Sequence, residues 1–231
     1  MSQEFNFKLE PIHTTKDLDA LTKSNNQKYG DFDSNTRSLD KRFIDTFTNT
    51  LKGEFNNVIV CGANKGEEVK IIKDINPTAE ITALDISDVA LEKLHNTEGL
   101  QDVKCLHKDL ENTTANDKQF DIYVALRTIP SSNVDMAKAL NEAMRITKNK
   151  IVLSVPNGYV IDGKIFNGMY EYEGKTIDKT IPFEIREELA KYFELHGWGV
   201  TYGESDGDLF ITAIPTPGEN AHIPDSRANL I

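Results

Sequence analysis

The sequence predicts an α/β fold built around a mostly parallel sheet, and three observations support that prediction. From Asn57 onward, short runs rich in β-branched residues alternate with longer stretches of helical periodicity, which is typical of β-α-β units. Two further apolar runs, beginning near residues 200 and 209, flank a turn-rich stretch, as in an antiparallel hairpin. The 231 residues are 39% hydrophobic and 27% charged, an ordinary balance for a globular protein.

The predicted core elements follow one another in a regular order. Ser87 is suited to cap the second helix, because a serine hydroxyl can accept a hydrogen bond from the first helical turn. Helices are expected where apolar residues recur at helical spacing, at residues 66–75, 88–96, 133–147 and 182–196. Strands are expected at residues 57–61, 80–85, 103–107, 120–125, 150–155, 200–203 and 209–214.

The segments around the core also have distinct patterns. Two polar helices, at 15–29 and 36–52, are expected to cover the sheet or close over a site. Residues 157–180 are too irregular for a helix and too aromatic for a linker, so we expect an insertion near the carboxyl edge of the sheet. The chain thus divides into a helical cap segment, a core and a loosely ordered tail, at residues 1–55, 56–214 and 215–231.

Charge and cysteine content narrow the classes of partner. The net charge of −11 repels phosphate backbones, so nucleic acid is a disfavoured partner. No run approaches 18 apolar residues and the first residues contain no apolar signal region, so we expect a cytoplasmic protein without a membrane span. Cys61 and Cys105 lack the spacing of metal ligands, and no metal is expected.

A glycine-containing turn joins the first core strand to the first core helix. In Gly62-Ala63-Asn64-Lys65-Gly66, Gly62 allows a sharp turn, Gly66 allows close helix-to-strand contact, and asparagine tolerates a left-handed backbone well. Such a turn lets the backbone approach a ligand. The dinucleotide fingerprint would require glycine at Asn64 and at Glu67, and both are absent.

Two carboxylates follow the next two strands. Asp85 ends the strand at 80–85, and Asp109 comes directly after the strand at 103–107. A carboxylate at the tip of the second strand can chelate a ribose diol. Because the carboxyl ends of parallel strands share one edge, both acids and the Gly62 turn are expected at the edge where open α/β sheets bind ligands.

This ordered set, together with Phe120-Asp121-Ile122-Tyr123, resembles the class I S-adenosylmethionine-dependent methyltransferases over residues 56–214. The resemblance implies a Rossmann-like three-layer αβα sandwich, whose seven-stranded, mostly parallel sheet has an antiparallel last strand. It also implies S-adenosylmethionine as cofactor. The sequence departs from the family pattern at Val60, where an acid is usual, and at Asn64, where a glycine is usual.

The resemblance also implies roles for individual residues. The Gly62 to Gly66 loop would pass beside the methionine part of the cofactor, Asp85 would bind the ribose hydroxyls, and Ile86 would lie against the adenine. The strand ending at Ala125 would present Leu126 and Arg127 to the transferring methyl group, and Arg127 would meet the cofactor's carboxylate or an anionic substrate. The implied cofactor-binding residues are Gly62, Ala63, Asn64, Gly66, Asp85, Ile86, Asp109, Leu110, Ala125 and Arg127.

The expected reaction is methyl transfer to a small-molecule or peptide acceptor by in-line displacement. Because a sulfonium is already a good leaving group, positioning can supply much of the catalysis, and no catalytic residue is assigned. Leu126-Arg127-Thr128-Ile129-Pro130 is unlike the motif of amide and exocyclic-amine methylases. Candidate substrate-binding residues, four of them aromatic pocket walls, are Tyr29, Arg127, Tyr159, Phe166 and Tyr170.

Other readings stay open. An NAD(P)-binding oxidoreductase would use the same glycine turn and Asp85, although the missing third glycine and the terminal hairpin disfavour it. A non-catalytic module of the same fold is consistent with Val60 and with the lack of a recognisable base. Ser154 to Gly158 is faintly similar to guanine-N7 cap methyltransferases, but the net charge disfavours a long RNA partner. Oligomeric state and pathway are not predicted.

Overall fold

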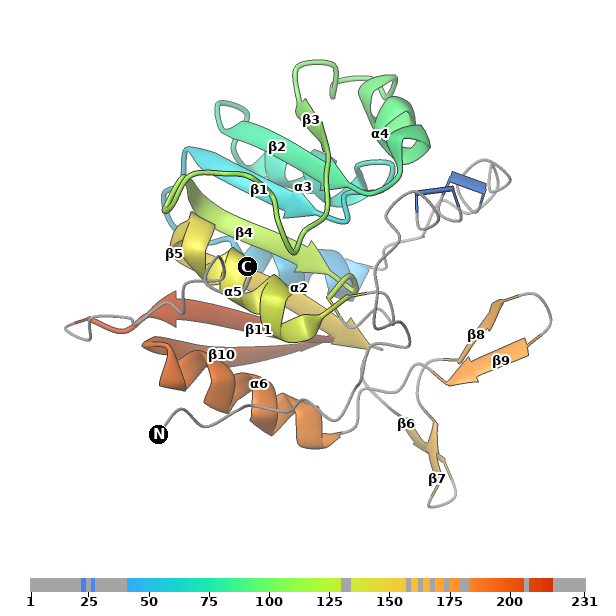
Figure 1. The fold of residues 1–231 in the computed structure, drawn as a ribbon, viewed down its shortest axis with the longest axis vertical. Helices are drawn as coiled ribbons and strands as arrows, with labels where there is room; N and C mark the ends of the chain where they lie inside the picture. Colours follow the sequence, from blue (N-terminus) through green and yellow to red (C-terminus); the bar gives the residue numbers. More distant parts are fainter. Residues whose placement is uncertain are drawn as a thin grey trace, which may run out of the picture.

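A seven-stranded sheet forms the centre of the protein, with helices on both faces (Figure 1). Strands β1 to β5 run parallel, β11 is antiparallel to β5, and β10 is antiparallel to β11, in the order β10-β11-β5-β4-β1-β2-β3. The computed structural model describes residues 22–23, 26–27, 41–129, 134–156, 159–161, 164–166, 169–172, 175–178, 183–205 and 208–217.

The strands confirm the predicted sheet, including its antiparallel closure. β5 begins at Thr147, earlier than expected from the sequence, because Thr147 pairs with Phe120 at the start of β4. The expected hairpin is longer than its apolar runs, since ladder pairing extends from Trp198 to Pro215. The strands are β1 (Asn57–Cys61), β2 (Glu80–Asp85), β3 (Lys104–His107), β4 (Phe120–Leu126), β5 (Thr147–Pro156), β10 (Trp198–Ser205) and β11 (Asp208–Pro215).

Two of the helices, α4 and α5, begin where a side chain satisfies a backbone N–H group of the first turn. Ser87 caps α4 as predicted, accepting a hydrogen bond from the Ala90 N–H at 3.1 Å. Asp135 caps α5 in the same way, so this helix begins three residues later than the expected 133. The helices are α2 (Lys41–Thr50), α3 (Glu67–Ile75), α4 (Asp88–His95), α5 (Met136–Ile146) and α6 (Phe183–Leu195).

Two apolar clusters, one on each face of the sheet, form the core. The first packs α5 and α6 against the sheet and contains Trp198 and Phe193. The second packs α2, α3 and α4 against the opposite face, where Phe43 and Phe47 of α2 contact Phe210 of β11. The described part of the helix predicted at 36–52, which forms α2, therefore covers the sheet. Of the other expected cap helix, at 15–29, the structure describes only residues 22–23 and 26–27.

The insertion after β5, for which no secondary structure was predicted beyond the exclusion of a helix, contains strands. It contains two antiparallel hairpins, each a two-stranded sheet separate from the central one (Figure 1). Short β-branched and aromatic runs separated by Asp162-Gly163 and Glu173-Gly174 are a hairpin signal that the sequence analysis overlooked. The four strands are β6 (Tyr159–Ile161), β7 (Lys164–Phe166), β8 (Met169–Tyr172) and β9 (Lys175–Asp178).

The described part of the chain contains no helix that combines the length and the apolar character needed to cross a membrane. The proposed division into cap, core and tail stays a prediction. Residues 218–231, most of the predicted tail, lie outside the described residues.

Candidate functional site

The turn after β1 is anchored on the end of β2. The N–H groups of Gly62 and Ala63 both donate to the Leu84 carbonyl, at 2.8 and 3.1 Å. Parallel pairing of β1 with β2 aligns Cys61 with Leu84, so both strands end at the same edge of the sheet. The glycine turn and the tip of β2 therefore form one continuous surface at the carboxyl ends of the strands.

Asp85 faces this turn. Its Oδ2 accepts a hydrogen bond from the Asn64 N–H at 2.9 Å, and its Oδ1 accepts one from the Ser87 N–H at 2.9 Å. The residue is only 5% exposed. A carboxylate has about four acceptor sites on its two oxygens, so acceptor capacity remains for a ligand hydroxyl.

Burial raises the pKa of Asp85 above its usual value, although hydrogen bonds from the backbone N–H groups of Ser87, Asn64 and Ile86, and the nearby His107, act in the opposite direction. The ionised carboxylate is therefore held at a cost in stability. Such a cost is typical of groups at functional sites, where a ligand rather than the fold uses the charge.

Asp121, a buried acid at the opposite end of the sheet, has a lowered pKa, whereas that of Asp85 is raised. Burial raises the pKa of Asp121, but the N–H groups of Asn56 and Asn57, at 2.8 and 3.0 Å, and the Lys148 ammonium outweigh it, and the net pKa is lowered. Asp121 is thus a structural acid at the amino end of β4, whereas Asp85 is a destabilised acid at the carboxyl end of β2.

We expect Asp85→Asn and Asp121→Asn to change the pH dependence of stability in opposite directions. The contribution of Asp85 to the free energy of unfolding is fully present below pH 3.8 and is lost as pH rises through its raised pKa. With rising pH, wild type therefore loses stability relative to Asp85→Asn. The Asp121 contribution is present above pH 3.8 and is lost as pH falls through its lowered pKa. Urea unfolding of wild type and both ligand-free variants between pH 3 and 8 measures the two effects. If the stability difference between wild type and variant changed with pH in the same direction for both acids, the assignment would be contradicted.

The glycine turn has a left-handed backbone where the sequence analysis predicted it. Gly62 has φ +71° and Asn64 has φ +48°. A Cβ at Gly62 would lie 2.3 Å from the Thr128 Oγ1 and 2.9 Å from the Thr128 Cβ, so Thr128 packs directly on the turn. At Gly66, a Cβ would lie 2.8 Å from the Leu100 Cδ1 and 2.9 Å from the Leu94 Cγ of α4, so close packing there leaves no room for a side chain. The predicted contact of Gly66 with the strand stays a prediction.

The loop after β3 lies against the same edge. The Lys108 N–H donates to the Asp85 carbonyl at 3.2 Å, which places Asp109 and Leu110 beside the tip of β2. The Asp109 Oδ1 accepts a hydrogen bond from the Glu111 N–H at 3.0 Å, and the Leu110 side chain is buried. The structure therefore brings together the Gly62 turn, Asp85 and its neighbour Ile86, and the start of the β3 loop.

Other predicted cofactor residues are placed differently. Ala63 and Ala125 are completely buried, and their assignment as cofactor-binding residues stays a prediction. Arg127 has φ +55° and directs its guanidinium to the carboxylate of Asp208 on β11. The guanidinium carbon lies 5.5 Å from the centre of the Phe43 ring. This ion pair was not predicted from the sequence.

Of the predicted aromatic pocket walls, Tyr29 lies outside the described residues. Tyr159 and Phe166 are cross-strand partners in the β6–β7 hairpin, and Tyr170 lies on β8. Their assignment as substrate-binding residues stays a prediction.

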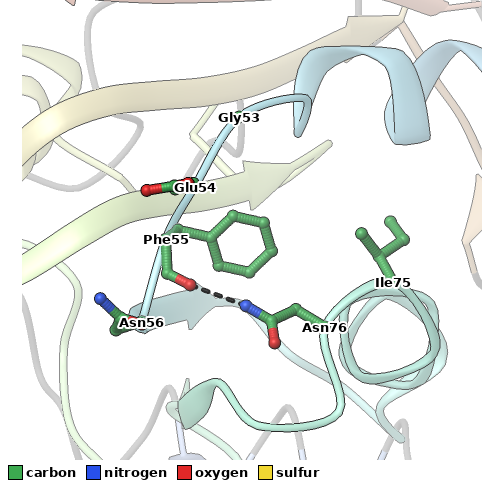
Figure 2. A pocket seen from close by; sticks show the side chains of 6 residues that line it. All are labelled: Gly53, Glu54, Phe55, Asn56, Ile75 and Asn76. Carbon is green, nitrogen blue, oxygen red and sulfur yellow. Dashed lines mark hydrogen bonds between the residues drawn. The ribbon is translucent and has the colours of Figure 1, made fainter.

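A surface hollow lies away from this edge, at the amino end of β1 (Figure 2). Phe55 and Asn76 meet there, and the Asn76 Nδ2 donates to the Phe55 carbonyl at 2.7 Å. This bond ties the α2–β1 and α3–β2 connections together, so we interpret the hollow as part of the packing between them. Among the described residues, no group of three or more His, Cys, Asp or Glu side chains is arranged to hold a metal ion.

Asn26 is a further residue at the edge that the sequence analysis missed. Its Nδ2 donates to the Asp88 Oδ1 at 2.6 Å, and its Oδ1 accepts from the Ser87 hydroxyl at 2.8 Å. Asn26 thus contacts the N-cap and the first residue of α4, two and three residues after Asp85. A single asparagine far along the chain carries no local signal of such a contact.

Residues 59–154 match a family model described as a methyltransferase domain. No curated protein matches the chain with significance.

Several solved structures are similar to the chain. A SAM-dependent methyltransferase from Aquifex aeolicus aligns at 15% identity with a TM-score of 0.61, over 82% of this chain and 98% of that one. The plantazolicin methyltransferase BpumL, solved with a pentazolic desmethylPZN analog and SAH, aligns at 14% identity with a TM-score of 0.63, over 86% and 96%. Magnesium protoporphyrin IX methyltransferase from Synechocystis PCC 6803, solved with SAM, aligns at 10% identity with a TM-score of 0.57, over 87% and 98%. At these identities the likeness shows a shared fold.

Proposed function

We propose that the chain is a class I S-adenosylmethionine-dependent methyltransferase that transfers the cofactor's methyl group to a small-molecule or peptide acceptor, because residues 59–154 match a methyltransferase domain and the fold is shared with a SAM-dependent methyltransferase. The observation that carries this proposal is the contact between the Asp85 carboxylate and the backbone of the left-handed turn at Asn64. It places an acid and a sharp glycine turn on the same surface, as binding of an adenosyl group requires.

The residues present fit this cofactor. The two oxygens of Asp85 are spaced to accept hydrogen bonds from a ribose diol, and Ile86, Asp109 and Leu110 adjoin the place of the adenine. Among the described residues, the buried Oδ1 of Asn64 has no hydrogen-bond partner. We assign this acceptor to the cofactor's ammonium, in place of the acid that Val60 replaces.

The chemistry asks little of the protein beyond orientation. S-adenosylmethionine, when bound, supplies an electrophilic methyl group on a sulfonium. The sulfur leaves as a neutral thioether and needs no protonation. The Gly62 turn and Asp85 would hold the donor so that its methyl group meets the acceptor in line. A base is needed only for an acceptor that loses a proton.

The acceptor class rests on charge and on the fold's neighbours. The net charge of −11 favours a small or peptide acceptor over a polyanion. BpumL was solved with a desmethylPZN analog, and another neighbour is named as a protoporphyrin methyltransferase. Pocket walls from the β6–β9 hairpins, and a cytoplasmic location, are further parts of the proposal.

We expect S-adenosylhomocysteine, and not NAD or NADP, to raise the melting temperature. At about 100 times its dissociation constant a ligand adds about 2.7 kcal/mol to stability, which for a domain of this size corresponds to about 5 °C or more. Differential scanning fluorimetry with the three ligands measures this. A shift with NAD alone would contradict the proposal in favour of an oxidoreductase.

Turnover separates an enzyme from a binding module. Incubation with S-adenosylmethionine labelled on its methyl group, together with small-molecule, peptide and RNA acceptor pools, should label one of the first two. Label in RNA would contradict the proposed acceptor class, and cofactor binding without label in any pool would favour the non-catalytic reading.

A further inference from the structure

Asp208, the first residue of β11, is a buried acid at the carboxyl edge of the parallel strands, opposite Pro156 of β5. Its two oxygens accept hydrogen bonds from the Nε and Nη2 of Arg127. The Asp208 side chain is 0% exposed and that of Arg127 is 24% exposed. A bidentate pair of this kind fixes the direction of the guanidinium as well as neutralising the buried charge.

Arg127 is also held by its backbone and by a ring. Its N–H donates to the Ser154 carbonyl at 2.9 Å and lies 3.1 Å from the Ser154 Oγ. The guanidinium carbon lies 5.5 Å from the centre of the Phe43 ring of α2. At φ +55° the residue adopts a backbone that side chains with a Cβ rarely adopt, and it persists because these contacts hold it there.

This conformation sets the course of the chain after β4. The next residue, Thr128, fills the space beside Gly62, with its Oγ1, Cγ2 and Cβ all within 2.9 Å of where a Gly62 Cβ would lie. The turn that Thr128 contacts carries Asn64, whose N–H donates to Asp85 at 2.9 Å. A contiguous series of contacts therefore runs from Asp208 to the acid at the tip of β2.

We propose that Asp208 is a positioning residue for the methyltransferase site. Acting through Arg127, it holds the chain after β4 against the Gly62 turn and so maintains the shape of the cofactor edge. The inference rests on the proposed function, because the ligand whose binding it affects is the cofactor. Asp208 itself does not touch the reacting atoms.

The test compares Asp208→Asn, Arg127→Gln and the double variant by calorimetric titration with S-adenosylhomocysteine, well below each melting temperature. Each single variant should bind about tenfold more weakly. The double variant should recover stability, because no unpaired charge stays buried. Its affinity for S-adenosylhomocysteine should remain about tenfold weaker, because two neutral side chains do not reproduce the bidentate pair. A purely structural ion pair predicts instead that affinity recovers together with stability.

Asp121→Asn is the matched control, since Asp121 is a buried acid at the other end of β4. It should lower stability and leave affinity within twofold. Amide hydrogen exchange of the ligand-free protein gives a second readout: exchange at the Arg127 N–H should be at least tenfold faster in Asp208→Asn and unchanged in the control.

Two results would overturn the inference and are distinguishable from each other. If wild type binds S-adenosylhomocysteine and Asp208→Asn binds it within twofold, Asp208 is only structural and the proposed function stands. If wild type does not bind it at all, the proposed function fails and this inference fails with it.

Discussion

Replacing Asp85 by alanine should weaken S-adenosylhomocysteine binding by at least a hundredfold while the chain remains folded. Two hydrogen bonds to a charged carboxylate contribute about 1.5–3 kcal/mol each, and a hundredfold loss corresponds to about 2.7 kcal/mol. The variant also frees the N–H groups of Asn64 and Ser87, which donate to Asp85 at 2.9 Å, so the ligand-facing turn loses one of its hydrogen bonds to β2. Calorimetric titration measures the loss of affinity.

Folding should change much less than binding. Burial raises the pKa of Asp85, so removing its carboxylate also removes the cost of burying a charge, which offsets the lost hydrogen bonds. Glu80→Ala is the control, because Glu80 is an exposed acid at the start of the same strand. Affinity that stays within a few-fold of wild type in Asp85→Ala would show that the ribose lies elsewhere.

The strands and the position of Asp85 could be predicted because both depend on local patterns. β-branched runs define buried strands whatever their partners are, and in parallel strands the residue that ends each run lies at the shared edge. The turn at Gly62 and Asn64 was predictable for the same reason, because few residue types adopt a positive φ.

The residues missed by sequence analysis are those whose partners are far along the chain. Asp208 meets Arg127 across 81 positions, and Asn26 meets Asp88 across 62. No periodicity records such pairs, so Arg127 was predicted to face a ligand, whereas the structure pairs it with a buried acid. Thr128 was missed because its importance lies in the absent Cβ of Gly62, which only the packing shows.

The second large effect is expected for Gly62→Ala, which should destabilise the protein by about 2–5 kcal/mol. A left-handed backbone costs a residue with a Cβ about 1–2 kcal/mol, and forcing an atom into packed space costs about 1–3 kcal/mol. The new methyl group would lie 2.3 Å from the Thr128 Oγ1, so either the turn or the chain after β4 must move. Urea unfolding measures the loss, and S-adenosylhomocysteine affinity should fall with it because the moved turn carries Asn64.

Gly99→Ala separates the two contributions. Gly99 has φ +81°, close to the +71° of Gly62, but a Cβ there would meet nothing within 4 Å. This control should therefore show the backbone cost alone, about 1–2 kcal/mol, with unchanged ligand affinity.

Thr128→Ala should relieve part of the Gly62→Ala cost and none of the Gly99→Ala cost, because it removes the Oγ1 and Cγ2 that the new methyl group would strike. Equal costs for the two glycine variants, or no coupling between Gly62→Ala and Thr128→Ala, would mean that Thr128 does not support the turn, and the path of contacts from Asp208 to Asp85 would be broken at that point.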